Sequence, residues 1–151
     1  MKLNFYDVDT EYVNYLRQYE KKIPFMEYKE RNKFLCGIVL TVHDINYFVP
    51  VSSNKNNYKS SFVIYDKDSY GNKVPLSSLR FSFMFPCPIE NVVVKDINSE
   101  TDIKYKSLTR KEYEYCNKHI DDIRKQAIKI YNLALQQENR ERYNLCDFQL
   151  L

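Results

Sequence analysis

The chain has 151 residues, of which 44% are hydrophobic and 28% charged, and this ordinary globular composition excludes a disordered or fibrous chain. Only two glycines are present. Both a dinucleotide-binding fingerprint and a P-loop need several glycines, so nucleotide-cofactor enzymes are disfavoured. The net charge of +3 is too small to indicate nucleic acid by itself. The length predicts one domain, residues 1–151.

The sequence predicts a cytoplasmic protein with reduced thiols. The first residues, 1–7, lack the apolar core of a secretion signal, and the longest apolar run, 34–40, is too short to span a bilayer. The cysteines are widely spaced and form no Cys-x-x-Cys pair, which disfavours a zinc site. We expect neither a metal nor another cofactor. The four thiols expected to be reduced and mostly buried are Cys36, Cys87, Cys116 and Cys146.

The first half of the chain predicts a helix and a hairpin. Asp9 can cap a helix whose apolar positions recur at helical spacing through Tyr19, and Pro24 is expected to end that segment. Residues 34–42 form a strongly apolar strand, and residues 45–49 form a second strand. The two residues between these strands, at 43 and 44, indicate a hairpin turn.

The strongest local feature is a polar segment after Pro50. Proline cannot donate to a sheet ladder, so we expect the strand to stop there and residues 52–60 to form a loop. No acidic residue occurs between Asp44 and Asp66, and Lys55 and Lys59 lie in this interval. Hydroxyl, amide and ammonium groups all bind phosphate oxygens, so this segment suits a polyanion. Surface loops are often rich in such residues for turn geometry alone.

The second half predicts three further strands and one long helix. The strands are expected at residues 61–65, 80–85 and 92–95. Thr109 and Glu112 match a capping box, and apolar residues then recur every three or four positions to Ala134. Strands in a run followed by a helix predict a compact α+β domain: a twisted, mostly antiparallel sheet with an N-terminal helix and a long C-terminal helix packed on it.

Basic residues also gather just before this expected helix. Lys104, Lys106, Arg110 and Lys111 flank Tyr105, and this cluster either holds an RNA backbone or is simply exposed. The two histidines show no spacing that pairs them with a carboxylate, so structural or surface roles are favoured for both.

Five stretches resemble, in the same order, the ToxN/AbiQ family of type III toxins. Residues 47–55 are similar to the family's active-site pattern of an aromatic residue, Pro, Thr or Ser, Ser, any residue and Lys. Family members often carry Trp soon after this Lys, whereas this chain has Tyr58. Each stretch is unspecific, but the ordered combination is not. The stretches are residues 5–16, 32–40, 47–55, 105–108 and 146–151.

The resemblance implies a metal-independent endoribonuclease. Its members cleave single-stranded RNA by attack of the ribose 2'-hydroxyl on the adjacent phosphate, which leaves a 2',3'-cyclic phosphate and a 5'-hydroxyl. Lys55 is implied to stabilise the charge on the phosphate, with a possible acid role, and Ser52 and Ser53 to orient it. Lys33 and Tyr12 are implied as further members of the catalytic site. The residues implied to bind RNA are Tyr58, Lys59, Lys104, Lys106, Arg110 and Lys111.

The resemblance further implies a structured RNA antitoxin, which the toxin processes from a repeat array in the bacterial cytoplasm. Two separate basic surfaces would let toxin and RNA close into a cyclic assembly, while single-stranded cellular RNA would be the substrate. Two other readings use the same residues. The chain is alternatively a noncatalytic RNA-binding module that tracks the backbone and stacks bases, or an interaction domain for an acidic protein surface.

Overall fold

The computed structural model describes residues 2–27 and 32–148, and the last residues of the resembling stretch, 149–151, lie outside them. Within the described residues, seven strands form one sheet in the order β4-β5-β3-β2-β1-β7, with β6 paired to β3, and their pairings are antiparallel. The predicted α+β class is confirmed. The strands are β1 Asn4–Val8, β2 Leu35–Val42, β3 Ile45–Ser52, β4 Ser61–Lys67, β5 Lys73–Arg80, β6 Phe85–Pro86 and β7 Val92–Val94.

The predicted hairpin between β2 and β3 is confirmed. His43 and Asp44 form its two-residue turn with φ values of 50° and 64°, the left-handed geometry that matches the twist of paired strands. The prediction that Pro50 ends the second strand is wrong, because β3 continues to Ser52.

The position of Pro50 between two neighbours of β3 explains its presence inside a strand. The Val51 amide donates to the Phe34 carbonyl, so the Pro50 nitrogen points to the opposite side of β3. On that side β6 pairs only with Tyr47 and Phe48, and β5 pairs only with Val51 and Ser52. The missing proline N–H therefore falls where the ladder changes partner.

Helix α1 spans Thr10–Leu16, and the side chain of Asp9 accepts a hydrogen bond from the Glu11 amide as the predicted N-cap. The helix is shorter than predicted and Pro24 does not end it. After Leu16 the chain makes turns that bring Ile23 and Met26 into the core. Strand β1, which the sequence analysis did not identify, precedes the helix.

The predicted long C-terminal helix is in fact two, α2 Ile103–Lys118 and α3 Ile120–Ala134, which meet at His119 with φ −120° and ψ 30°. The predicted capping box is also wrong. Asp102 caps α2 by accepting from the amides of Lys104 and Tyr105, seven residues before the expected cap, Thr109. Thr109 instead donates to the Tyr105 carbonyl inside the helix, and Glu112 is buried. A further short helix, α4 Gln137–Tyr143, follows α3.

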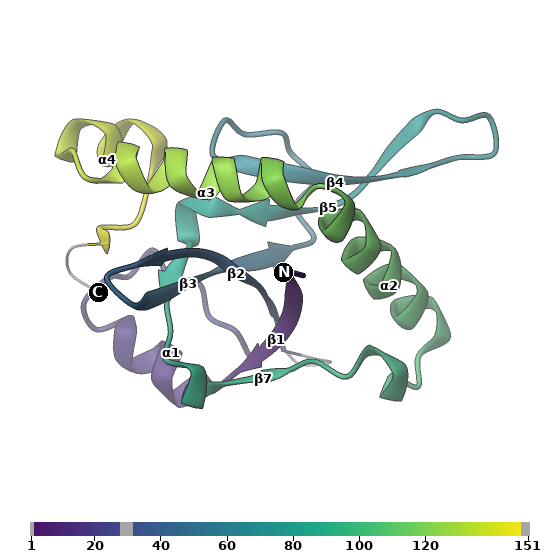
Figure 1. The fold of residues 1–151 in the computed structure, drawn as a ribbon, viewed down its shortest axis with the longest axis horizontal. Coiled ribbons are helices and arrows are strands. Elements are labelled where there is room, and N and C mark those ends of the chain that lie inside the picture. The colour runs from purple at the N-terminus through teal and green to yellow at the C-terminus, as the bar shows by residue number, and fades with distance from the viewer. Residues whose placement is uncertain (1, 28–31, 149–151) are drawn as a thin grey trace.

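The strand expected at residues 80–85 is wrong as well. Arg80 ends β5, Phe81–Phe83 form a short 3-10 helix (η1), and β6 is only two residues long. The β4–β5 hairpin turns at Gly71, with φ 80°, while the Asp68 side chain accepts from the amides of Tyr70 and Asn72. This hairpin extends beyond the body of the molecule at the upper right of Figure 1.

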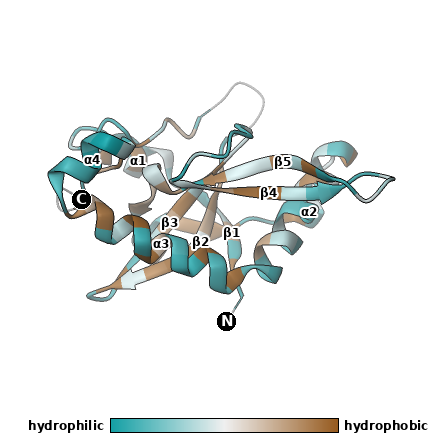
Figure 2. Cartoon of the chain, turned by 90° about the horizontal axis from the view of Figure 1, so that it is seen from above, coloured by the Kyte–Doolittle hydropathy of each residue, from teal (hydrophilic) through white to brown (hydrophobic). Residues whose placement is uncertain are grey.

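Helices α2 and α3 pack on the sheet through the predicted apolar stripe. Buried side chains recur along it, and most of α4 is hydrophilic (Figure 2). No helix within residues 2–27 and 32–148 is long and apolar enough to cross a membrane. All four cysteines are free and buried, as predicted. The buried residues of the stripe are Cys116, Ile123, Ala127, Ile130 and Ala134.

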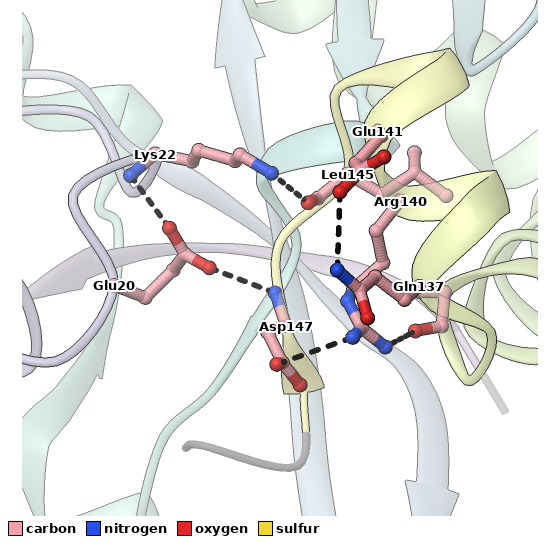
Figure 3. A network of polar contacts seen from close by, with 8 residues as sticks. Glu20, Lys22, Gln137, Arg140, Glu141, Leu145 and Asp147 are labelled. Atoms are coloured by element: carbon pink, nitrogen blue, oxygen red, sulfur yellow. Dashed lines mark hydrogen bonds and ion pairs between the residues drawn. The ribbon is translucent and has the colours of Figure 1, made fainter.

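Polar contacts attach the C-terminal segment to the turns after α1 (Figure 3). Lys22 Nζ donates to the Leu145 carbonyl at 2.6 Å, and the Glu20 carboxylate accepts from the Asp147 amide at 2.8 Å. Arg140 of α4 lies 3.6 Å from the Asp147 carboxylate. The contacts of Lys22 and Glu20 join residues more than one hundred positions apart, and the ion pair with Arg140 connects the same segment to α4.

Candidate active site

The candidate active site is built on the loop of residues 53–60, here called the Lys55 loop, which connects β3 to β4. The loop is fixed at its far end by α3 and α4. Gln126 of α3 donates to the Lys59 carbonyl at 3.0 Å, and Lys59 Nζ lies 5.4 Å from the centre of the Tyr143 ring. Lys59, predicted to bind RNA, is exposed but already has this aromatic neighbour.

Two consecutive side-chain turns shape the first half of the loop. The Ser52 hydroxyl accepts from the Asn54 amide at 3.1 Å, and the Asn54 side chain accepts from the Asn56 amide at 2.9 Å. From β5, Ser78 donates to the Asn54 carbonyl at 2.6 Å. Lys55 sits between these anchored residues with an exposed side chain. The loop therefore presents its ammonium group from a backbone that is held on both sides.

The register of β2 and β3 brings Lys33 to this loop. Leu35 pairs with Pro50, and the hydrogen bond between the Val51 amide and the Phe34 carbonyl continues the pairing by one step. Lys33 directly precedes Phe34, so it lies next to the end of this pairing, where β3 leads into the loop. Ser53 follows Ser52 and is exposed. Four of the five predicted catalytic residues are thus gathered at the end of β3.

Tyr12 lies elsewhere. Its hydroxyl donates to the Pro86 carbonyl at 3.1 Å, and Pro86 pairs with Tyr47 near the start of β3. Tyr47 and Ser52 are five residues apart, roughly 17 Å along a strand. Burial, with smaller contributions from Cys87 and Tyr15, raises the pKa of Tyr12 to about 12. Tyr12 is therefore a neutral hydrogen-bonding group at neutral pH.

Tyr58 forms the exposed aromatic face of the loop. Its hydroxyl accepts from the Asn56 side-chain amide at 3.0 Å, and this hydrogen bond lowers the pKa of Tyr58. Tyr58 is 44% exposed, which makes it a candidate for base stacking. The guanidinium carbon of Arg80 lies 4.9 Å from the centre of this ring and the same distance from the Phe83 ring.

The basic cluster on α2 does not join this site. Lys111 forms an ion pair with Asp66 of β4 at 3.0 Å, and Arg110 hydrogen-bonds Asn98. Asp66 is six residues beyond Ser60, roughly 20 Å along the chain of a strand. Lys104 is exposed and Lys106 half-buried at the start of the helix. The cluster is therefore a second, separate basic surface.

Sequence reasoning missed the three groups that support the loop from other elements: Ser78, Arg80 and Gln126. Ser78 and Arg80 lie on β5, a strand that was not recognised, and alternate positions along it face the loop. The signal was present as a polar Ser and Arg spaced two residues apart beside an apolar Leu79. In the part of the chain that the structure describes, no three His, Cys, Asp or Glu side chains group as a metal site.

Comparisons with known proteins relate the whole chain to one family. The model of the family described as Toxin ToxN, type III toxin-antitoxin system, matches residues 4–151. The chain is 28% identical over 159 residues to the endoribonuclease ToxN of Pectobacterium atrosepticum, a match that covers 99% of this chain and 90% of that protein.

Two solved structures share the fold. One is AbiQ, a lactococcal anti-phage endoribonuclease of a type III toxin-antitoxin system, with TM-score 0.82 and 26% identity. The other comes from a bacterial antiviral system that a processed non-coding RNA regulates, with TM-score 0.83 and 25% identity. Each match covers 100% of this chain and 94% of the other chain. The chain therefore belongs to the ToxN family, the endoribonuclease toxins of type III toxin-antitoxin systems.

Proposed function

We propose that this chain cleaves single-stranded RNA without a metal ion, by attack of the ribose 2'-hydroxyl on the adjacent phosphate. The oxygen of the 2'-hydroxyl bonds to phosphorus, and the bond from phosphorus to the 5'-oxygen breaks. The 2'-hydroxyl loses a proton and the leaving 5'-oxygen gains one, so the products carry a 2',3'-cyclic phosphate and a 5'-hydroxyl. The observation that supports this most directly is the anchored Lys55 in an acid-free loop beside two serines.

The residues of the loop suit the demands of this reaction. A preorganised cation stabilises the charge that grows on the nonbridging oxygens, and Lys55 is held for that task by the turns on either side. The Ser52 oxygen accepts from the Asn54 amide, which leaves its proton free to donate to a phosphate oxygen. Ser53 supplies a second, exposed hydroxyl, and Lys33 adds positive charge next to the end of the strand pair.

Tyr12 lies away from the Lys55 loop, near the start of β3, where its hydroxyl donates to the Pro86 carbonyl. A group with a pKa of about 12 is a poor base near neutral pH, so Tyr12 suits a hydrogen bond to RNA that flanks the cleaved linkage. This role removes Tyr12 from proton abstraction.

The inhibitor that we propose is a structured RNA in the bacterial cytoplasm, which the toxin cuts from a repeat array. A similar solved structure comes from a system regulated by a processed non-coding RNA. The Lys55 loop and the basic cluster on α2 are separate surfaces, and each can contact a different RNA unit. An RNA end in the active site with its body on the next toxin would block substrate and close a ring.

A cleavage assay tests the reaction. Purified, RNA-stripped protein is incubated with single-stranded RNA in excess EDTA, and the product ends are identified by mass spectrometry. Discrete fragments with cyclic phosphate ends are expected. RNA with a 2'-deoxy substitution at the cleaved linkage should stay intact there. Cutting of the deoxy linkage, or activity that requires added magnesium, contradicts the mechanism, and binding without cleavage favours the noncatalytic RNA-binding module.

Coexpression with a repeat array tests the antitoxin. Gentle purification at low salt should retain short RNA in a closed assembly, which light scattering would detect as several toxin chains with bound RNA. Because many contacts would be to phosphate, the complex should dissociate steeply as salt rises. Recovery of active, RNA-free toxin at low salt would defeat the antitoxin proposal without affecting the proposed reaction.

A further inference from the structure

Arg80 is a cation that the proposed mechanism does not use. It ends β5, keeps part of its surface exposed, and places its guanidinium against the rings of Tyr58 and Phe83. Within residues 2–27 and 32–148, no carboxylate forms an ion pair with it. Burial lowers the pKa of Arg80, because a buried charge loses part of its hydration. A partly buried arginine without an acidic partner favours binding of an anion from outside the chain.

Two buried polar atoms, one on Arg80 and one on its neighbour Ser61, also lack hydrogen-bond partners. Neither Arg80 Nε nor the Ser61 hydroxyl has a hydrogen-bond partner among the described residues, and both atoms are buried. Ser61 and Arg80 are paired across β4 and β5, so their side chains leave the same face of the sheet. Buried polar groups without hydrogen-bond partners are rare in folded proteins because each costs free energy. Two such groups at one pair of positions therefore indicate a binding site.

This place lies directly under the Lys55 loop. Ser78 and Arg80 are two residues apart on β5 and therefore point to the same face. Ser78 contacts the carbonyl of Asn54, whereas Arg80 contacts the ring of Tyr58. Lys55 lies between Asn54 and Tyr58 in the loop, so the guanidinium is next to the segment that carries Lys55.

We propose that Arg80 binds a phosphate of the RNA next to the one held by Lys55, with the Tyr58 ring stacking on a base of the same strand. The guanidinium fork matches phosphate oxygens in a two-point contact, and the two rings hold it in one orientation before RNA arrives. Base stacking on an aromatic ring tolerates any sequence, which suits Tyr58. The inference rests on the proposed function, because it assumes RNA in the Lys55 loop.

Binding measurements separate this role from that of a clamp that only holds Tyr58 in place. The probe is a fluorescent, fully 2'-O-methylated single-stranded RNA of mixed sequence and about 12 nucleotides, which the proposed reaction cannot cut. Its Kd is measured over a series of salt concentrations for the wild type, Arg80→Met and Arg80→Lys. The slope of log Kd against log salt counts phosphate contacts, at about 0.7 for each contact with single-stranded RNA.

Arg80→Met should lower the affinity about tenfold and reduce the slope by about 0.7, the value for one lost phosphate contact. Arg80→Lys keeps a charge but not the fork, so it should keep the slope and lose part of the affinity. The matched control is Lys73→Met. Lys73 lies on the same strand, 5.2 Å from the centre of the Tyr65 ring, but seven residues from Arg80, roughly 23 Å along β5 and well beyond the screening length.

The control should bind RNA as the wild type does. An unchanged slope in Arg80→Met would overturn the proposal and make Arg80 a clamp, as would the same slope change in Lys73→Met. If Arg80→Met fails to fold, Arg80→Gln takes its place, and an unchanged slope in that variant has the same overturning effect. Unmodified RNA is tested in parallel. Failure of the wild type to cleave it would sink the proposed reaction, while the salt slopes would still decide whether Arg80 contacts phosphate.

Discussion

The Lys55 loop and the basic cluster on α2 look alike in the sequence and differ in the structure. Both combine lysines with tyrosine and polar residues. In the loop, no acidic side chain lies within ten residues of Lys55, and the hydrogen bonds are made by amides and hydroxyls. On α2, the carboxylate of Asp66 already pairs with Lys111. Lys111 therefore has an internal anion, which weakens its claim to a phosphate relative to Lys55.

Strand β5 separates these two regions. Ser77 and Ser78 are neighbours on it and point to opposite faces. Ser77 donates to the buried carboxylate of Glu112 on α2 at 2.5 Å, and Ser78 donates to the Asn54 carbonyl in the loop. The same strand thus anchors a helix on one face and the candidate site on the other, so each region can be changed without altering the other.

The largest effect is expected for Lys55→Ala. The variant should fold as the wild type does, because the side chain is exposed, and should cleave RNA about a hundredfold or more slowly, the scale of losing one preorganised electrostatic group. Initial rates on one RNA, together with circular dichroism of both proteins, measure this. Equal rates in two folded proteins would remove Lys55 from the mechanism and end the contrast with the α2 cluster.

Glu112→Gln tests the other face of β5 through stability. Burial raises the pKa of Glu112 from 4.5 to about 7, so the folded protein keeps a proton that the unfolded chain has lost in this range. Stability of the wild type should therefore fall as pH rises from about 4.5 to 7, by at most about 3 kcal/mol. The glutamine can still accept from Ser77 and should remove this fall.

Urea unfolding at pH 5 and pH 8 measures the difference between wild type and Glu112→Gln. The variant should gain stability relative to the wild type at pH 8 and little at pH 5, with RNA cleavage unchanged. If the stability difference between wild type and Glu112→Gln is the same at pH 5 and pH 8, Glu112 does not keep its proton in the folded protein.

Ser78→Ala should affect the loop and spare α2. It removes the hydrogen bond to the Asn54 carbonyl and leaves Ser77 in place, so the loop loses one of its anchors. We expect cleavage to slow roughly tenfold because small displacements of a catalytic group are costly. Ser77→Ala is the matched control and should lower stability with little effect on the cleavage of folded protein. A larger loss of cleavage in the control would reverse this assignment of the two faces.

The smallest effects are expected on α2. Replacing Lys104 and Lys106 together by Ala should weaken binding of the antitoxin RNA several-fold and leave cleavage of a short RNA unchanged, because the cluster is remote from the loop. Lys111→Ala should change RNA binding least, since its ammonium already pairs with Asp66. A greater loss from Lys111→Ala than from the double variant would show that the ion pair opens to bind RNA.

The sequence by itself determined the features that depend on neighbouring residues. The two-residue turn at His43 and Asp44, the Asp9 cap, the polar loop around Lys55 and the apolar stripe of α3 are all local, since a few adjacent side chains decide each of them. The α+β class followed from their order, and the ordered resemblance led to the family.

Only the tertiary structure decided what lies around the loop. Thr109 and Glu112 match a capping box, yet Glu112 is buried against Ser77, thirty-five residues away in sequence, and the helix starts earlier. Arg80 read as the start of a strand, but it ends one and lies under Tyr58. Such positions depend on which strands pair and which faces meet, and these are set by burial of the whole core.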